Sequence, residues 1–164
     1  MQATRFGREG GESIILRFSY FHAPDSDFTR DTIRQAKKGW AATFGSPDEF
    51  MASIHADDAA TAVVAAIDAH AGTYNVSDDE PLRRRGYFDV LAGAIGCAPP
   101  RLPPEWLGRI AGAVGDAVAR SQRVSNRRFR EASGWGPQSA CMREGWVQVV
   151  AEAAESTEAA PSRV

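Results

Sequence analysis

The sequence has little cysteine, no long apolar run and almost no excess charge, and each shortage excludes a class of protein. Its two cysteines, Cys97 and Cys141, are too few for a disulfide framework or a zinc site. This usage is typical of a reducing compartment, so we expect a cytoplasmic protein. No apolar run approaches the ~20 residues that cross a bilayer, and the first residues lack the apolar stretch of a signal peptide. No membrane partner is therefore expected.

Charge is nearly balanced, with a formal net charge of −2 over 164 residues. That balance argues against binding to a nucleic acid or another polyanion. Basic residues gather only at Arg83–Arg85 and between Arg120 and Arg130. Either cluster would suit a phosphate-bearing substrate, or would simply form a solvated helix face. The length is that of one domain, which typically has ~100–200 residues.

Two motifs of nucleotide chemistry are also missing. No glycine-rich phosphate loop follows a predicted strand, because Gly7–Gly10 precedes a strand and Gly112–Gly115 falls inside a predicted helix. None of the three tyrosines, Tyr20, Tyr74 and Tyr87, has a lysine four residues later. The sequence thus predicts neither a dinucleotide cradle nor a tyrosine whose pKa a neighbouring lysine lowers.

What is present is an alternation of short strands and helices. Strands are predicted at about 13–21, 40–44, 53–55 and 73–76, and helices at about 25–38, 56–70, 78–95, 104–120, 125–132 and 139–154. The expected helix caps include Asp78–Glu80, Ser125 and Ser139. The alternation indicates an α/β fold with a mostly helical final third. The apolar run 13–21 predicts a strand buried on both faces, and the end from 155 to 164 predicts a disordered tail.

Four motifs, in order over roughly residues 12–147, carry a resemblance to a known family. They are Leu16–Pro24, Ser53–Ala60, Gly72–Val76, and Ser125-Asn126 followed by Gly134–Pro137 and Glu144-Gly145. The first resembles the Leu-Arg-x-x-x-x-Tyr-Gly-Pro segment of the NAD-dependent epimerase/dehydratase family, the extended short-chain dehydrogenase/reductases. The next two resemble its Ile-His-Val-Asp-Asp-Val-Ala element and its Gly-x-Tyr-Asn-Val strand. The last resembles its Leu-Gly-Trp-x-Pro and Glu-Gly ending.

The resemblance implies a particular half of a larger protein. In that family an N-terminal Rossmann half carries the glycine-rich loop and the Tyr-x-x-x-Lys pair, and a long helix follows. Residues 2–11 would be the tail of that helix. Residues 1–154 would then form the C-terminal part of a Rossmann-like parallel sheet plus a small, mostly helical substrate-binding lobe, with the N-terminal nucleotide-binding half absent. The implied cofactor is NAD or NADP, which this fragment alone is not expected to bind tightly.

The resemblance also assigns site residues by position. Phe18, Ser19 and Tyr20 match the stretch that faces the cofactor. Phe21 and His22 match positions that touch substrate, and Arg123 is a further candidate because it precedes the Ser125-Asn126 motif. His22 stands where the family usually has Tyr, which leaves the substrate open. No catalytic residue and no metal ligand is assigned.

Three other residues have two interpretations each. His55 is a general base by residue type, or a hydrogen-bonded anchor for the start of the next helix. Asp57 and Asp58 form a carboxylate pair for a metal or for acid–base chemistry, or they favour the helix N-terminus. Neighbouring helical side chains point ~100° apart, which favours the second interpretation.

Three functions remain open at this stage. The first is the substrate-binding half of an NAD(P)-dependent nucleotide-sugar-type epimerase, dehydratase or reductase, inactive alone. The second is a non-catalytic remnant that acts as an interaction module. Such a module would pair with a separate N-terminal half or self-associate through the sheet edge at 13–21. The third is a truncated reading frame with no function of its own.

Overall fold

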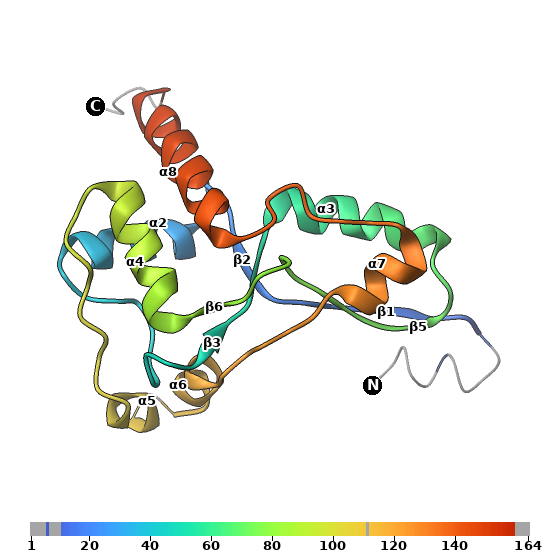
Figure 1. Ribbon diagram of the computed structural model, residues 1–164, viewed down its shortest axis with the longest axis horizontal. Helices are drawn as coiled ribbons and strands as arrows, with labels where there is room; N and C mark the ends of the chain where they lie inside the picture. The colour runs from blue at the N-terminus through green and yellow to red at the C-terminus, as the bar shows by residue number, and fades with distance from the viewer. Residues whose placement is uncertain (1–5, 7–10, 111, 160–164) are drawn as a thin grey trace.

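The computed structural model describes residues 6, 11–110 and 112–159. Most of the predicted helix tail at 2–11 lies outside these residues. Figure 1 shows an elongated molecule with strands β1 and β5 and helices α3 and α7 at one end, and helices α2, α4, α5 and α6 at the other. No helix in the described part of the chain is both long enough and apolar enough to cross a membrane.

Strands and helices alternate along most of the chain, which confirms the α/β class. The strands are β1 (Ile14–Phe18), β2 (Tyr20–His22), β3 (Phe50–Met51), β4 (Ser53–His55), β5 (Gly72–Val76) and β6 (Leu82–Arg83). The helices are α2 (Asp27–Lys37), α3 (Ala56–Ala65), η1 (Ala66–Asp68, a 3₁₀ turn), α4 (Arg84–Ile95), α5 (Trp106–Ile110), α6 (Gly112–Ala119), α7 (Arg127–Ser133) and α8 (Met142–Ala159).

The first two strands form one extended segment that pairs with two different partners. β1 runs parallel to β5, and β2 runs parallel to β4, with His22 opposite His55. Ser19 lies at the change of partner, where its N–H donates to the carbonyl oxygen of Val76 at 3.1 Å. Parallel pairing brings the carboxyl ends of these strands to the same edge of the sheet. β3 and β6 form a short antiparallel pair that the sequence did not predict.

The prediction that segment 13–21 is buried on both faces is wrong. Ile14, Leu16 and Phe18 pack into a core formed with α3 and α7, as strand alternation requires. Arg17, which points to the opposite face, is exposed, and so is its partner Asn75 on β5. In the described residues, the helices that contribute to this core therefore lie on one face of the β1–β5 sheet.

A second hydrophobic core lies at the helical end of the molecule and holds its elements together. Its buried members are Ala36, Ala41, Met51, Leu82, Tyr87, Phe88, Leu91, Met142, Trp146 and Val149. Tyr87, Phe88 and Leu91 recur at helical spacing on α4, so one face of that helix packs against α8. This packing fixes the first turn of α8 near the end of β2, because the ring of Trp146 stacks on that of His22.

Several predicted elements begin or break elsewhere. Helix α4 starts at Arg84 and not near Pro81, because residues 82–83 pair with β3. The predicted helix 104–120 is split into α5 and α6 at Gly112, whose φ of +64° interrupts the helix. The predicted strand at 40–44 is a single bridge between Trp40 and Arg101.

The last two helices also differ from expectation. Asn126 occupies the N-cap of α7, although the Ser125 hydroxyl accepts a hydrogen bond from the Arg127 amide at 3.3 Å. Helix α8 begins at Met142, three residues beyond the predicted cap at Ser139, and continues to Ala159. The predicted disorder from 155 is therefore wrong as far as Ala159, because the Glu- and Ala-rich sequence also favours a helix. Residues 160–164 lie outside the described part of the chain.

Candidate functional site

Residues 18–22 lie at the carboxyl edge of the parallel strands, where open α/β sheets bind ligands. The rings of Phe18 and Phe21 meet with centroids 5.3 Å apart, and Phe21 remains 48% exposed. The ring of Tyr20 stacks on Phe28 of α2 at 6.5 Å. The segment therefore presents aromatic surface at this edge, which is the kind of wall that a flat ring packs against.

Tyr20 connects this segment to the chain around Arg123. Burial raises the pKa of the Tyr20 phenol, against the opposing effects of the Arg84 guanidinium and a hydrogen bond with Gln122. The Gln122 amide in turn donates to the Phe50 carbonyl at 2.8 Å, and the Arg123 guanidinium lies 5.2 Å from the centre of the Phe50 ring. Tyr20 thus stays a neutral phenol at physiological pH and is suited to hydrogen bonding, not to proton abstraction.

Two of the predicted site residues point into the protein. The exposed fraction is 8% for Ser19 and 3% for His22. The His22 side chain could contact a substrate only if the packing around Trp146 opened. The substrate-binding role of His22 therefore stays a prediction. Phe21 and Arg123, by contrast, are exposed. The side chains available to a ligand at this edge are therefore the aromatic and guanidinium groups.

The buried imidazoles of His22 and His55 meet edge to face, with centroids 5.6 Å apart. Burial, together with the neighbouring His55, lowers the pKa of His22 from 6.5 to about 3. Nδ1 of His22 and Nε2 of His55 have no hydrogen-bond partner within the described residues. The charged form of His22 is therefore strongly disfavoured, and His22 is neutral at physiological pH.

Asp78, just after β5, is a buried acid that the sequence analysis treated only as a helix cap. Its carboxylate accepts a hydrogen bond from the Ser53 hydroxyl at 3.0 Å, and its side chain is 4% exposed. Burial raises its pKa from 3.8 to about 7, the negative charges of Asp79 and Glu80 add to the rise, and the hydrogen bonds from Ser53 and the Met142 backbone oppose it. The missed signal was its position two residues beyond β5, at the carboxyl edge of a parallel strand.

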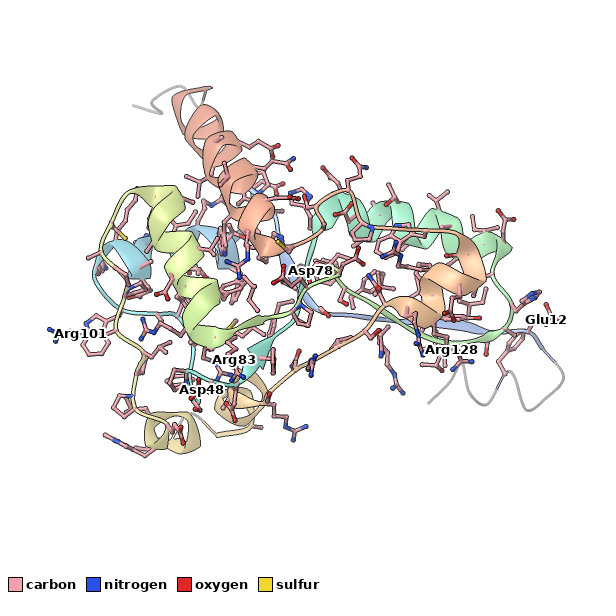
Figure 2. The ribbon with its side chains drawn as sticks, in the orientation of Figure 1. Glu12, Asp48, Asp78, Arg83, Arg101 and Arg128 are labelled. Atoms are coloured by element: carbon pink, nitrogen blue, oxygen red, sulfur yellow. The ribbon has the colours of Figure 1, made fainter. Side chains whose placement is uncertain are left out.

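The acidic run from Asp78 to Glu80 holds the fold together and does not cap α4. The Asp79 carboxylate accepts from the side-chain amide of Asn126 at 2.7 Å and from the Arg130 guanidinium at 2.8 Å. Glu80 lies 3.8 Å from Arg143 on α8. The run therefore links α7 and α8 to the end of β5. Figure 2 shows Asp78 near the middle of the molecule.

The geometry supports the anchoring interpretation of His55, and it places Asp57 and Asp58 in the first turn of α3. Nδ1 of His55 accepts a hydrogen bond from the Asp57 amide at 3.3 Å, which caps α3. Asp57 is exposed, whereas Asp58 is buried and accepts from the backbone amides of Gln138 and Ser139. The two carboxylates do not converge, and no three metal-binding side chains gather within the described residues.

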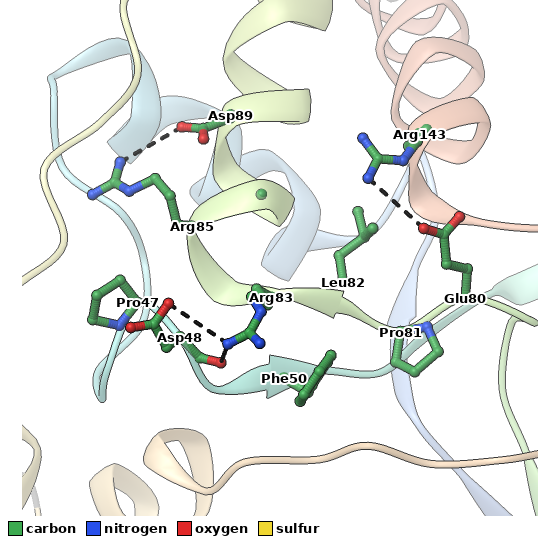
Figure 3. A pocket seen from close by; sticks show the side chains of 11 residues that line it. Pro47, Asp48, Phe50, Glu80, Pro81, Leu82, Arg83, Arg85, Asp89 and Arg143 are labelled. Carbon is green, nitrogen blue, oxygen red and sulfur yellow. Dashed lines mark hydrogen bonds and ion pairs between the residues drawn. The ribbon is translucent and has the colours of Figure 1, made fainter.

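A pocket of about 450 Å³ lies near Phe50, between the β3–β6 pair and the first turns of α4 and α8 (Figure 3). Three arginines and three acids line it together with an apolar floor: Arg83, Arg85, Arg143, Asp48, Glu80, Asp89, Phe50, Pro81 and Leu82 among others. Figure 2 shows Arg83 beside Asp48, whose carbonyl oxygen it reaches at 2.8 Å. The sequence indicated the basic cluster Arg83–Arg85 but not the pocket, because Arg143 comes from a distant helix.

Comparison with solved structures shows a shared fold. The chain is similar to a human epimerase family protein with NADPH, at a TM-score of 0.76 and 14% identity over 85% of this chain and 48% of that one. It is also similar to UDP-glucose 4-epimerase from Thermotoga maritima with UDP-glucose, at a TM-score of 0.71 and 20% identity over 96% of this chain and 51% of that one. A third match is dTDP-glucose 4,6-dehydratase from Bacillus anthracis with NAD, at a TM-score of 0.67 and 12% identity over 95% of this chain and 48% of that one.

These matches define a class of fold and no more. The chain spans about half the length of each of these structures. No protein-family model matches the sequence, and no curated protein matches it. The α/β fold of this chain is therefore that of part of the epimerase and dehydratase structures.

The described residues fit one end of a dinucleotide and not the other. Phe18 and Phe21 offer an apolar wall beside the carboxyl edge, which suits a flat nicotinamide-like ring. No glycine in the described residues stands between a strand and the helix that follows it, so they form no cradle for a pyrophosphate. Any dinucleotide bound by these residues alone would lack its main anchor.

Proposed function

We propose that this chain supplies the substrate-facing half of an NAD(P)-dependent epimerase, dehydratase or reductase site that acts on nucleotide-sugar-like small molecules. The observation that carries the proposal is segment 18–22, an aromatic surface at the carboxyl edge of parallel strands, in a fold matched by half of several cofactor-bound enzymes. When bound, the cofactor would supply hydride transfer. The free thiols of Cys97 and Cys141 favour a cytoplasmic setting.

In this proposal, the residues of this chain bind and orient the substrate. Phe21 packs against an apolar part of it, Tyr20 donates a hydrogen bond from its neutral phenol, and Arg123 pairs with an anionic group. The cofactor cradle and the catalytic acid–base residues come from a Rossmann-type half outside these 164 residues, whether joined to Met1 or carried by another chain. The 164 residues alone therefore have no oxidoreductase activity.

A titration of the ¹⁵N-labelled chain tests this function. UDP-glucose is expected to shift the amide signals of residues 18–22 and 121–123 with a Kd of roughly 1 mM or weaker, and NADPH is expected to bind no more tightly than ~1 mM. Arg123→Gln should weaken the UDP-glucose response several-fold, because it removes a charged donor. Its control is Arg120→Gln, an equally exposed arginine of the same run. Tight NADPH binding, or equal effects of the two variants, would count against the proposal.

A second candidate function, an interaction module, is favoured by the exposed side of the β1–β5 sheet. Parallel sheets are normally covered on both faces. Here Ile15 and Arg17 occupy the face opposite the helices, and each strand of this sheet pairs with only one other among the described residues. The fitting partner is a Rossmann-type half that adds a parallel strand to β1, or else a second copy of this chain.

If the chain associates through this face, its apparent mass in gel filtration should rise with protein concentration. Ile15→Arg should shift the equilibrium toward monomer at least tenfold, because a charge on an apolar contact costs more than ~1.4 kcal/mol. Thr73→Arg, on the same face of β5, should act in the same direction. A monomer at every concentration, with no fluorescence from an apolar dye, would argue against an exposed docking face.

A further inference from the structure

Residues 18–22 do not line the pocket between β3, β6, α4 and α8, although Phe50, one of its lining residues, also contacts Arg123 of the proposed substrate site. Its volume of about 450 Å³ is in the range of small-molecule sites, which run from ~300 to ~1,000 Å³. Three guanidinium groups from three different elements stand around it: Arg83 on β6, Arg85 on α4 and Arg143 on α8 (Figure 3).

These arginines are only loosely paired with acids. The separations between guanidinium nitrogen and carboxylate oxygen are 3.6 Å for Arg83–Asp48 and Arg85–Asp89, and 3.8 Å for Arg143–Glu80. All three distances exceed that of a hydrogen bond. The six side chains are at least 40% exposed, so each acid is free to turn away from its partner. Arg83 and Arg85 each also donate one hydrogen bond to a backbone carbonyl oxygen, that of Asp48 at 2.8 Å and that of Pro100 at 2.9 Å. A guanidinium group has five N–H donors, so further donors remain for a ligand.

The floor of the pocket is apolar. Phe50, Pro81 and Leu82 contribute to it, and the guanidinium groups of Arg83 and Arg123 each lie 5.2 Å from the centre of the Phe50 ring. A flat ring placed against Pro81 and Leu82, or on Phe50 in place of one of these guanidinium groups, would bury apolar surface while its charged substituent reaches the arginines. The pocket thus combines a surface for a ring with donors for an anion.

The first turn of α4, which forms one wall, breaks two rules of helix stability. It holds Arg84 and Arg85 and no acid, although the positive end of the helix dipole favours carboxylates. It also contains Gly86, where alanine would stabilise the helix and where an added Cβ would meet nothing within 4 Å. The buried hydrogen bonds of Arg84 explain its place in this turn, whereas nothing packs against Gly86. A local rule that is broken without a packing reason, as at Gly86, tends to mark a functional site.

We propose that this pocket binds a small phosphate monoester that carries a flat apolar group. A carboxylate ligand would gain little, because it would only replace the carboxylates of Asp48, Glu80 or Asp89. A phosphate has about two negative charges and three acceptor oxygens, which suits three loosely paired guanidinium groups better. This inference goes beyond the proposed function and needs no cofactor-binding half.

The test is an NMR titration of the full ¹⁵N-labelled chain at pH 7.5 with phenyl phosphate, inorganic phosphate and benzoate. Phenyl phosphate should shift the amides of Leu82 and Gly86 with a Kd near ~1 mM, and the other two probes should bind roughly tenfold more weakly. Equal binding of benzoate and phenyl phosphate, or shifts that avoid these amides, would overturn the inference. The UDP-glucose response is followed separately, at the amides of residues 18–22, which do not line the pocket.

Two variants with opposite expected effects make the test sharper. Arg143→Gln should weaken phenyl phosphate binding about tenfold, whereas Glu80→Gln should tighten it about threefold because it releases Arg143. Gly86→Trp should fill the pocket and abolish binding, and Gly86→Ala is its control for helix stability. If Glu80→Gln weakens binding, or Arg143→Gln leaves it unchanged, the arginines do not hold the phosphate.

Discussion

Replacing Arg84 by glutamine is expected to lower the free energy of unfolding by about 3 kcal/mol, as measured by urea denaturation. The Arg84 side chain is fully buried at the start of α4. Its Nη1 donates to the Glu49 carboxylate and to the Ser46 carbonyl, both at 2.7 Å. Its Nη2 donates to the Ala119 carbonyl at 3.1 Å. Glutamine would leave these acceptors without their donor, which is the costly way to break a buried ion pair.

The matched control is Arg85→Gln, one residue later. Arg85 is 40% exposed, and its guanidinium donates to one carbonyl, that of Pro100, besides its loose pairing with Asp89. The expected loss there is under ~1 kcal/mol, because exposed ion pairs contribute little. Similar losses for the two variants would mean that Arg84 does not clamp the loop at 46–49 to α4 and the end of α6.

The second large effect is on the pH dependence of stability, where Asp78 and His22 are expected to act in opposite directions. The pKa of Asp78 is raised on folding from 3.8 to about 7, so the folded state keeps a proton that the unfolded state loses. Its contribution is full below pH 3.8 and falls as the pH rises toward 7. The pKa of His22 is lowered from 6.5 to about 3, so its contribution is full above pH 6.5 and falls as the pH drops toward 3.

Between about pH 4 and pH 6.5 the two slopes cancel in the wild-type chain. Asp78→Asn should therefore make stability rise by up to about 1.4 kcal/mol per pH unit across this range, relative to wild type. His22→Gln should make it fall by a similar amount. Urea denaturation from pH 4 to 7 measures the free energy of unfolding of wild type and of both variants. The surface carboxylates are the same in all three proteins, so their contribution cancels when the variants are compared with wild type. Parallel curves for the three proteins would show that neither group is shifted as described.

Local features of the fold were predictable because they depend on neighbours in the sequence. Ser53-Ile-His55 forms a strand, and His55 caps α3 through the Asp57 amide. Each of these depends on residues within a few positions of one another. The predicted helix across Gly112 failed because its apolar spacing did not reveal the positive φ at that glycine.

The candidate site was predictable only in part, for the same reason. The position of residues 18–22 after an apolar strand was enough to place them at the carboxyl edge of the parallel strands, which is where open α/β sheets bind ligands. Whether each side chain faces out or in depends on partners far along the chain. Trp146, more than 120 residues away, covers His22, while Phe21, which pairs with Ile54 of β4, is left exposed.

The sequence by itself determined the α/β class, most strand and helix positions and the aromatic segment 18–22, since these follow from periodicity and turn chemistry. Only the tertiary structure decided which polar groups are buried and which charges meet. Arg84 and Arg85 are neighbours of one type, yet one is buried and the other lines an open pocket. Burial, and with it the pKa of Asp78 and His22, is set by packing between distant segments, which local residue patterns do not specify.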